Sequence, residues 1–184
     1  MMTLPATLAL PLLTISGRGT IARLLQQCAA FSARGVLLHG SSLRKSGRLD
    51  SIMRTTPPGL SICTVEHSGG EPTLGDVRRV MSEARAHRAQ WLAAAGGGSV
   101  LDLGKAAAGL FHSPHDAAAH HDGLQVEQPG VPFIAAPTTA GTGSEATTVA
   151  VLINEATGVK KSIRDNSFMA RRTVQRAIFP PRPV

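Results

Sequence analysis

Residues 91–105 read WLAAAGGGSVLDLGK, and this stretch decides the fold. A short apolar run ends in three consecutive glycines, and apolar residues at helical spacing follow them. This pattern is typical of a buried strand that turns directly into a helix. Glycines let the backbone turn tightly and approach a bulky anion, and the first amides of a helix have no partner inside it. The stretch therefore predicts a strand, a phosphate-binding turn and a helix over 99–111.

The start of that helix carries signals of its own. Ser99 is expected to cap the helix, and Asp102 stands at the capping-box distance from it. Because the glycines are contiguous, the stretch differs from the dinucleotide fingerprint G-x-G-x-x-G, and it also lacks the G-K-[ST] ending of a P-loop. A glycine-rich turn before a capped helix, with no ligand, is the alternative interpretation.

Further apolar runs place this strand in a sheet. Candidate helices over 19–33 and 73–89 separate the runs, and Thr73 is a suitable N-cap for the second helix. Short buried strands that alternate with helices predict a doubly wound α/β fold with a mainly parallel sheet. Residues 147–154 and 159–163 flank a turn and predict a β-hairpin near the C-terminal end. The other strands are expected at Val36–His39, Ser61–Val65 and Val131–Ala136.

A second loop follows the last of these strands. Residues 136–145 read APTTAGTGSE, which offers four hydroxyls and two glycines between residues 138 and 144. Such a loop suits ribose and phosphate oxygens, although a polar turn without a ligand is an equal alternative when the loop is taken alone. Both loops fall at the carboxyl ends of expected parallel strands, where open α/β sheets bind ligands. Their convergence favours a nucleotide.

Composition predicts a single domain and favours a cytoplasmic location. The chain has 184 residues, of which 42% are apolar and 17% charged, so it can form its own core. We expect a domain over residues 1–172 and an irregular tail rich in Pro and Arg over 173–184. No apolar run reaches the length of a membrane span, and Leu4–Ile15 is interpreted as an edge strand instead of a signal peptide. The two cysteines favour reduced thiols in a cytoplasmic protein.

The chain is basic, with a formal net charge of +7. A basic chain can bind nucleic acid. Here the excess charge is dilute and lies late in the chain, no aromatic residues interleave with it, and no nucleic-acid module is recognisable. We therefore expect no nucleic-acid partner, and we interpret the charge as a solvated basic face or as a site for a small phosphate-bearing ligand.

Together, the two loops resemble the signature loops of the iron-containing (group III) alcohol dehydrogenases. That family has G-G-G-S-x-x-D-x-x-K followed by P-T-T-A-G-T-G-S-E about 40 residues later, and residues 96–105 and 137–145 match both patterns. The resemblance covers roughly residues 11–172. It implies a Rossmann-like N-terminal domain that binds NAD or NADP, with a small alcohol or aldehyde as substrate. A homodimer is a further expectation.

The resemblance also assigns residues to the cofactor. Gly97, Gly98 and Ser99 would contact the pyrophosphate, and Asp102 would order their loop. The second loop would contact the ribose and the nicotinamide. Lys160 would reach a ribose hydroxyl, although the alignment could slip by one onto Lys161. The residues of the second loop are Thr138, Thr139 and Thr142, with Ser144 nearby.

The loop after the second expected strand favours NADP over NAD. Residues 39–47 read HGSSLRKSG, without the carboxylate that would accept from the adenosine ribose and repel a 2′-phosphate. The loop is similar to the G-x-S-x-[KR]-K-x-G loop of NADP-preferring members. Gly40, Ser41 and Ser42 fit contacts to a phosphate, and Arg44 and Lys45 add positive charge. One departure is Glu71, where the family often has Asn and where an acid could weaken cofactor binding.

The resemblance implies a metal that this sequence does not hold. The family binds catalytic Fe²⁺ or Zn²⁺ through one Asp and three His in a helical second domain, and the first ligand is expected beyond Val184. The helical metal-binding domain is therefore expected to be absent, and no metal ligand or catalytic residue is assigned. Two functions follow: an apparently truncated NAD(P)-dependent alcohol dehydrogenase, or a catalytically inactive NAD(P)-binding module that could be half of a split enzyme.

One local cluster has residue types that bind metals. His112, His115, His120 and His121 lie close together in sequence with two aspartates. Their surroundings contain Gly and Pro and predict a surface loop over 111–130. We interpret the cluster as part of a variable loop and not as a metal site.

Overall fold

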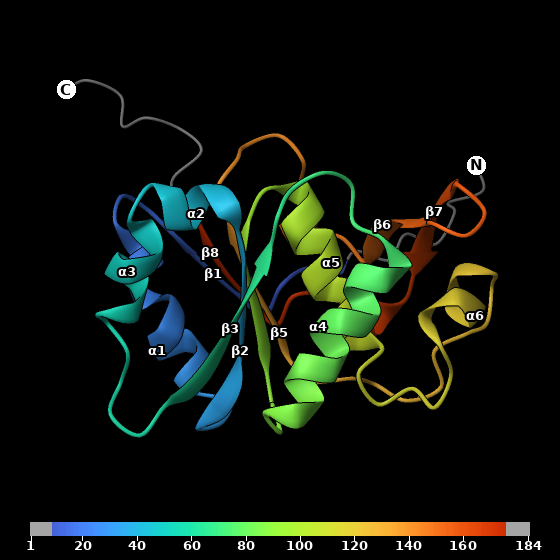
Figure 1. Cartoon of the computed structure of the whole chain (residues 1–184). Coiled ribbons are helices and arrows are strands. Elements are labelled where there is room, and N and C mark those ends of the chain that lie inside the picture. The colour runs from blue at the N-terminus through green and yellow to red at the C-terminus, as the bar shows by residue number, and fades with distance from the viewer. Residues whose placement is uncertain (1–8, 176–184) are drawn as a thin grey trace, which may run out of the picture.

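The apolar runs of the sequence become strands, and helices occupy most of the segments between them (Figure 1). The computed structural model describes residues 9–175. The strands are β1 (Leu13–Ser16), β2 (Arg34–Gly40), β3 (Ser61–His67), β4 (Leu92–Gly96), β5 (Phe133–Pro137), β6 (Val149–Asn154), β7 (Val159–Arg164) and β8 (Arg172–Gln175). The α-helices are α1 (Leu24–Ala29), α2 (Ser41–Lys45), α3 (Arg48–Met53), α4 (Leu74–Ala86), α5 (Gly98–Gly109) and α6 (Ala117–His121). Three short 3-10 helices are η1 (Thr20–Arg23), η2 (Ser144–Ala146) and η3 (Asn166–Phe168).

Six strands form one parallel sheet in the order β1-β8-β5-β4-β2-β3. β6 and β7 form a separate antiparallel hairpin. The expected doubly wound α/β fold with a C-terminal hairpin is therefore confirmed. The expected strands at 36–39, 61–65 and 131–136 correspond to β2, β3 and β5.

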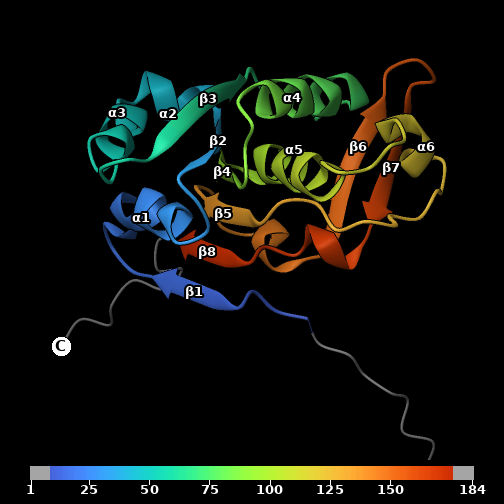
Figure 2. The same cartoon turned by 90° about the horizontal axis from the view of Figure 1, so that it is seen from below.

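Alternating side chains of the sheet fill two separate cores. In β2, Val36 and Leu38 join the core under α4 and α5, whereas Leu37 joins the core under α1 and α3. Because successive side chains of a strand point to opposite faces, an apolar strand supplies both cores at once. Figures 1 and 2 show the two helical layers on opposite faces of the sheet.

Helix α5 packs unusually close to the sheet because it contains a glycine on its buried face. A Cβ built on Gly104 would lie 2.6 Å from the Cβ of Ala94 and 2.9 Å from a ring carbon of Phe133. Any side chain at this position would push α5 away from β4 and β5. The small residue therefore sets the height of α5, and with it the position of the loop that precedes this helix.

The β6–β7 hairpin lies on the far side of α5 from α1 and α3 (Figure 2). Its strand β6 contacts α5 and also joins the segment before α4, where the amide of Ile153 donates to Pro72 O at 2.9 Å. A parallel bridge between Thr73 and Ile153 extends this connection. The hairpin thus connects α5 with the segment before α4.

Three segments differ from expectation. The helix expected over 19–33 consists only of η1 and α1, which end at Ala29. The loop expected over 111–130 contains α6, because the Asp116 side chain caps it and forms a bidentate pair with Arg78 at 2.8 Å. The tail expected from residue 173 is wrong for its first three residues, since β8 runs through Gln175 between β1 and β5.

The expectations for the two ends of the chain are tested only in part. The edge strand expected over Leu4–Ile15 is shorter in the structure: β1 lies at an edge of the sheet but begins only at Leu13, and residues 9–12 are not strand. Residues 1–8 and 176–184, which include most of the expected Pro/Arg-rich tail, lie outside the described residues.

Candidate cofactor-binding site

Three of the loops singled out in the sequence meet at one edge of the sheet. β5, β4 and β2 are neighbours, and they end at Pro137, Gly96 and Gly40. After β3 the chain crosses β2 and continues as β4 on its other side, so the direction of winding reverses between β2 and β4. Open α/β sheets bind ligands at such a switch point, outside the carboxyl ends of the strands.

The first loop presents the open end of a helix. α5 begins at Gly98, its N-cap is Gly97, and no side chain makes a capping hydrogen bond. The predictions that Ser99 caps this helix and that Asp102 completes a capping box are therefore wrong. The helix begins one residue earlier than expected, so Ser99 lies inside its first turn. The amides of that turn stay available to an anion.

The two glycine-bearing loops contact each other. A Cβ on Gly98 would lie 3.1 Å from Cγ2 of Thr142, and a Cβ on Gly97 would lie 3.4 Å from Oγ1 of Thr139. The amide of Thr138 donates to Gly96 O at 2.9 Å, which joins the ends of β4 and β5. Thr138, Thr139 and Thr142 are exposed beside these glycines. The loops thus form a backbone cradle rimmed by hydroxyls, as an anion with sugar groups requires.

Asp102 connects the first helix to the second loop. Its carboxylate accepts from Ser144 Oγ at 2.5 Å and from the backbone amide of Val151 at 3.1 Å. Ser144 is buried, so its hydroxyl faces Asp102 and not the open surface. Both residues therefore lie beneath the loops, in a position to fix their shape.

A buried lysine next to Asp102 was not identified as a site residue from the sequence. Lys105 is fully buried, and its Nζ donates to Val149 O at 2.6 Å and to Thr147 Oγ1 at 2.9 Å. Its position in the motif was visible, but exposure of a helical lysine cannot be deduced from spacing. Burial lowers the pKa of Lys105, while the nearby carboxylates of Asp102 and Glu145 act in the opposite direction.

The loop expected to select NADP begins directly at the end of β2. Gly40 is buried at the strand end, and Ser41 and Ser42 open the short helix α2. Arg44 on this helix is already paired, since its Nε lies 2.6 Å from Oε2 of Glu66. The structure therefore places an acid beside the predicted phosphate loop, contributed by β3 and not by the loop itself.

Lys160 lies on the hairpin and contacts the segment before α4. Its Nζ is 3.0 Å from Oε1 of Glu71, while Lys161 points to Asp122 at 3.6 Å. Lys160 is the register partner of Ile153, whose amide binds Pro72 O, so the backbone itself brings Lys160 and Glu71 together. Lys160 thus pairs with Glu71 before α4. The contacts that join the two glycine-bearing loops involve other residues, Gly98 with Thr142 and Gly97 with Thr139.

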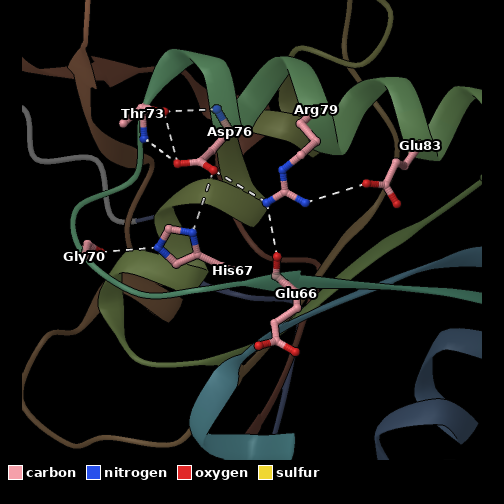
Figure 3. A network of polar contacts seen from close by, with 7 residues as sticks. All are labelled: Glu66, His67, Gly70, Thr73, Asp76, Arg79 and Glu83. Atoms are coloured by element: carbon pink, nitrogen blue, oxygen red, sulfur yellow. Dashed lines mark hydrogen bonds and ion pairs between the residues drawn. The ribbon is translucent and has the colours of Figure 1, made fainter.

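A polar network fixes the segment that carries Glu71 (Figure 3). His67 at the end of β3 contacts Gly70 O through Nε2 at 3.3 Å, and its Nδ1 lies 4.0 Å from Asp76. Asp76 and Thr73 form a capping box at the start of α4, as expected for a helix capped by Thr73. Burial raises the pKa of Asp76, but the hydrogen bonds from Thr73, together with His67 and Arg79, outweigh burial and lower the net pKa.

The histidine cluster forms structural contacts. His120 contacts Ser113 Oγ at 2.7 Å and Leu124 O at 2.9 Å, and His121 contacts Leu152 O at 3.3 Å. Within residues 9–175, no group of three or more His, Cys, Asp or Glu side chains could hold a metal ion. The described residues therefore do not fit the Fe²⁺ or Zn²⁺ that the resemblance implies.

Comparisons with known proteins agree with this geometry. The family model for iron-containing alcohol dehydrogenase matches residues 11–175. The probable alcohol dehydrogenase EutG of Escherichia coli strain K12 is 33% identical over 165 residues, which are 89% of this chain and 42% of that protein. The NAD-dependent methanol dehydrogenase of Bacillus methanolicus is 28% identical over 162 residues, with 86% and 42% covered.

Solved structures show the same fold. Sulfoacetaldehyde reductase from Bifidobacterium kashiwanohense in complex with NAD⁺ superposes with a TM-score of 0.85 at 26% identity, covering 95% of this chain and 46% of that one. NADH-dependent butanol dehydrogenase A from Thermotoga maritima gives 0.84 at 24% identity, with 94% and 44% covered. The chain thus spans less than half the length of these proteins.

In the described part, no helix has the length and apolar character needed to cross a membrane.

Proposed function

Because this chain belongs to the iron-containing alcohol dehydrogenase family, we propose that it binds a nicotinamide dinucleotide for hydride transfer between an alcohol and an aldehyde or ketone. One observation carries the proposal. The uncapped first turn of α5 lies against the threonine-rich loop at the switch point of the sheet, where a Cβ on Gly98 would stand only 3.1 Å from Cγ2 of Thr142. A dinucleotide needs this combination of free amides, hydroxyls and close backbone approach.

The proposed roles follow the positions of the residues. Gly97, Gly98 and Ser99 bind the pyrophosphate through backbone amides and a hydroxyl. Thr138, Thr139 and Thr142 hydrogen-bond the ribose and the nicotinamide side. The bound nicotinamide supplies the hydride chemistry, and the protein orients it.

Three further residues complete the proposed cofactor site. Asp102 and Ser144 keep the two loops in register through the hydrogen bond between them. Lys160 reaches a ribose hydroxyl from the hairpin, next to Glu71.

NADP is the proposed preference, and NAD the alternative. Gly40, Ser41 and Ser42 lie at the start of α2, where backbone and hydroxyl groups can meet a 2′-phosphate. Arg44 lies on the same helix but is paired with Glu66. A 2′-phosphate therefore has to compete with that carboxylate for the guanidinium, which moderates the preference.

The described residues hold no set of ligands for a metal ion. Fe²⁺ or Zn²⁺ stays a proposal for the family's complete active site. The cradle formed by the two glycine-bearing loops also supports a second candidate function, in which this chain is a dinucleotide-binding module without turnover or one half of a split enzyme. The two candidates share the cofactor site and differ only in catalysis.

The purified chain separates these candidates. NADP⁺, NAD⁺ and their reduced forms are titrated by calorimetry, and turnover is assayed with Fe²⁺ or Zn²⁺ and a panel of alcohols. Turnover above the blank supports the dehydrogenase, whereas binding without turnover supports the module. If neither cofactor binds to folded protein, the proposed function fails.

Two properties of the surroundings complete the proposal. A homodimer is supported by the edge position of β1, with Leu12 and Leu13 exposed at 78% and 42%. A cytoplasmic location is supported by Cys28 and Cys63, which are both free. Sedimentation and fractionation test these two points.

A further inference from the structure

We propose that Lys105 is a positioning residue for the cofactor: its buried ammonium holds the segment after the threonine loop against α5, and this fixes where Thr142 stands. The inference rests on the proposed function, because it concerns the same dinucleotide site. It assigns a role to the lysine that ends the glycine-rich motif.

Besides its ion pair with Asp102 on the same helix, Lys105 makes three hydrogen bonds that reach beyond α5. Nζ donates to Val149 O at 2.6 Å, to Thr147 Oγ1 at 2.9 Å and to Thr147 O at 3.3 Å. These acceptors lie at the start of β6 and just before it. One side chain thus ties the middle of α5 to the segment that leaves the second cofactor loop.

A series of polar contacts leads from Lys105 to the cradle. Thr147 Oγ1, which accepts from Lys105, donates to Ser144 O at 3.3 Å. The amide of Ser144 then donates to Thr142 Oγ1 at 3.4 Å. Thr142 in turn is the residue that limits the space above Gly98. A displacement at Lys105 therefore reaches the cradle through two intervening residues.

Packing alone does not account for a lysine here. The side chain is 0% exposed, and burying an ammonium carries a desolvation cost that an apolar residue of similar length avoids. What a lysine adds is three N–H donors, which serve acceptors on a segment that lacks helix or sheet partners at Thr147. The lysine therefore serves to order the loop through these donors, which an apolar side chain that only fills the core would lack.

The neighbouring acids make the same point. Asp102 Oδ1 lies 3.4 Å from Nζ of Lys105, and Asp102 itself holds Ser144 and Val151. Glu145 Oε2 is buried without a hydrogen-bond partner, and this carboxylate also acts on Lys105. Without the ammonium, Asp102 and Glu145 would both lose the cation with which they interact. The ammonium of Lys105 and the carboxylate of Asp102 thus both bind the segment over residues 144–151, the first as a donor and the second as an acceptor.

The decisive variant is Lys105→Met, with Lys105→Gln as a milder form that keeps an N–H donor. Leu103→Ala is the matched control, because Leu103 is equally buried on α5 but belongs to the apolar core. For each protein, three quantities are measured: the dissociation constant of NADPH by fluorescence, the thermal midpoint, and hydrogen exchange of the amides of residues 138–149.

We expect Lys105→Met to raise the dissociation constant by about tenfold, since it removes hydrogen bonds from a charged donor. Exchange over residues 138–149 should accelerate while that of β2 and β4 stays slow, and Lys105→Gln should recover part of the affinity. Leu103→Ala should lower the thermal midpoint but leave the affinity and the loop exchange near wild type.

Two results would overturn the inference. One is unchanged affinity and loop exchange in folded Lys105→Met protein. The other is an equal loss of affinity in Leu103→Ala at a matched loss of stability, which would reduce Lys105 to a packing role. Absence of binding in the wild-type chain is a distinct outcome, since it refutes the proposed function itself and the role of Lys105 with it.

Discussion

The ammonium of Lys160 and the carboxylate of Glu71 lie 3.0 Å apart, across the junction between the β6–β7 hairpin and the segment before α4. Both side chains are 51% exposed, so solvent screens the pair and a ligand can compete with it. The residue that the family resemblance assigns to a cofactor ribose therefore already has an anionic partner in this chain.

Replacing Glu71 with Asn or Gln should strengthen cofactor binding. The change releases Lys160 and removes a negative charge near a ligand that is itself an anion. Because the pair is exposed, we expect only about a twofold to fivefold decrease in the dissociation constant of NADP⁺ or NAD⁺. Calorimetry at low salt measures it. Glu127→Gln makes the same change in charge at another exposed position and should have no effect; weaker binding in the Glu71 variants would instead make this carboxylate a ligand of the ribose.

Glu66 should limit the preference for NADP. Its carboxylate lies 2.6 Å from Arg44 Nε, next to the loop proposed to bind the 2′-phosphate. We expect Glu66→Gln to lower the dissociation constant of NADP⁺ about threefold relative to that of NAD⁺, and Arg44→Ala to change the ratio in the opposite direction. Parallel titrations of both cofactors give the ratio directly. Equal effects of Glu66→Gln on the two cofactors would contradict a role at the 2′-phosphate.

A methyl group on Gly98 should block the cradle. The new Cβ would stand 3.1 Å from Cγ2 of Thr142, in the space between the loops. We expect Gly98→Ala to weaken dinucleotide binding by about tenfold or more, while the free energy of unfolding changes by less than about 1 kcal/mol because Ala is favoured in a helix. Thr142→Ser removes the nearest atom but keeps the hydroxyl, so the double variant should regain part of the affinity. If the double variant recovers no affinity, the added methyl group obstructs the ligand directly and does not act by displacing Thr142.

The pair between Arg78 and Asp116 should make stability depend on pH at the acid end. The Arg78 side-chain hydrogen bonds hold the pKa of Asp116 at about 2, below its ordinary 3.8. Because the pKa is lower in the folded chain, the pair stabilises the fold above about pH 4, and this contribution disappears as the pH falls to about 2.

The matching variant is Asp116→Asn, which can still cap α6 but carries no charge. We expect it to lower the free energy of unfolding by about 0.5–1 kcal/mol at pH 7, with the difference from wild type shrinking below pH 4. Denaturant midpoints at several pH values measure the difference. A difference that is constant with pH would assign the effect to the cap and not to the ion pair.

Much of the fold could be predicted from sequence because its strands are short, apolar and separated by glycine or polar turns. β4 with its glycines and α4 with its Thr73 cap are local patterns: β4 forms one residue later than expected, and α4 starts after its expected cap but ends at Ala86, three residues early. β8 was missed because Arg172-Thr173-Val174-Gln175 has no apolar run of its own. It becomes a strand by pairing with β1 and β5, which lie far away along the chain.

The candidate site shows the same division. The two loops and their threonines are visible as motifs, whereas the contacts of Asp102 and Lys105 depend on where the hairpin packs. Asp102 was expected to bond within its own helix but binds Ser144 and Val151 instead. Lys105 is buried because β6 covers α5, which no local pattern encodes.

The pairing of β1 with β8 has a consequence for synthesis on the ribosome. β1 pairs with β8 from Leu13↔Arg172 to Ser16↔Gln175, and Thr20 Oγ1 donates to Gln175 O at 2.8 Å. β1 emerges from the exit tunnel well before β8 and therefore has to wait for this partner. Until then the nascent polypeptide exposes one margin of β5, and a chaperone that shields this margin during translation would protect the chain when it is most prone to aggregate.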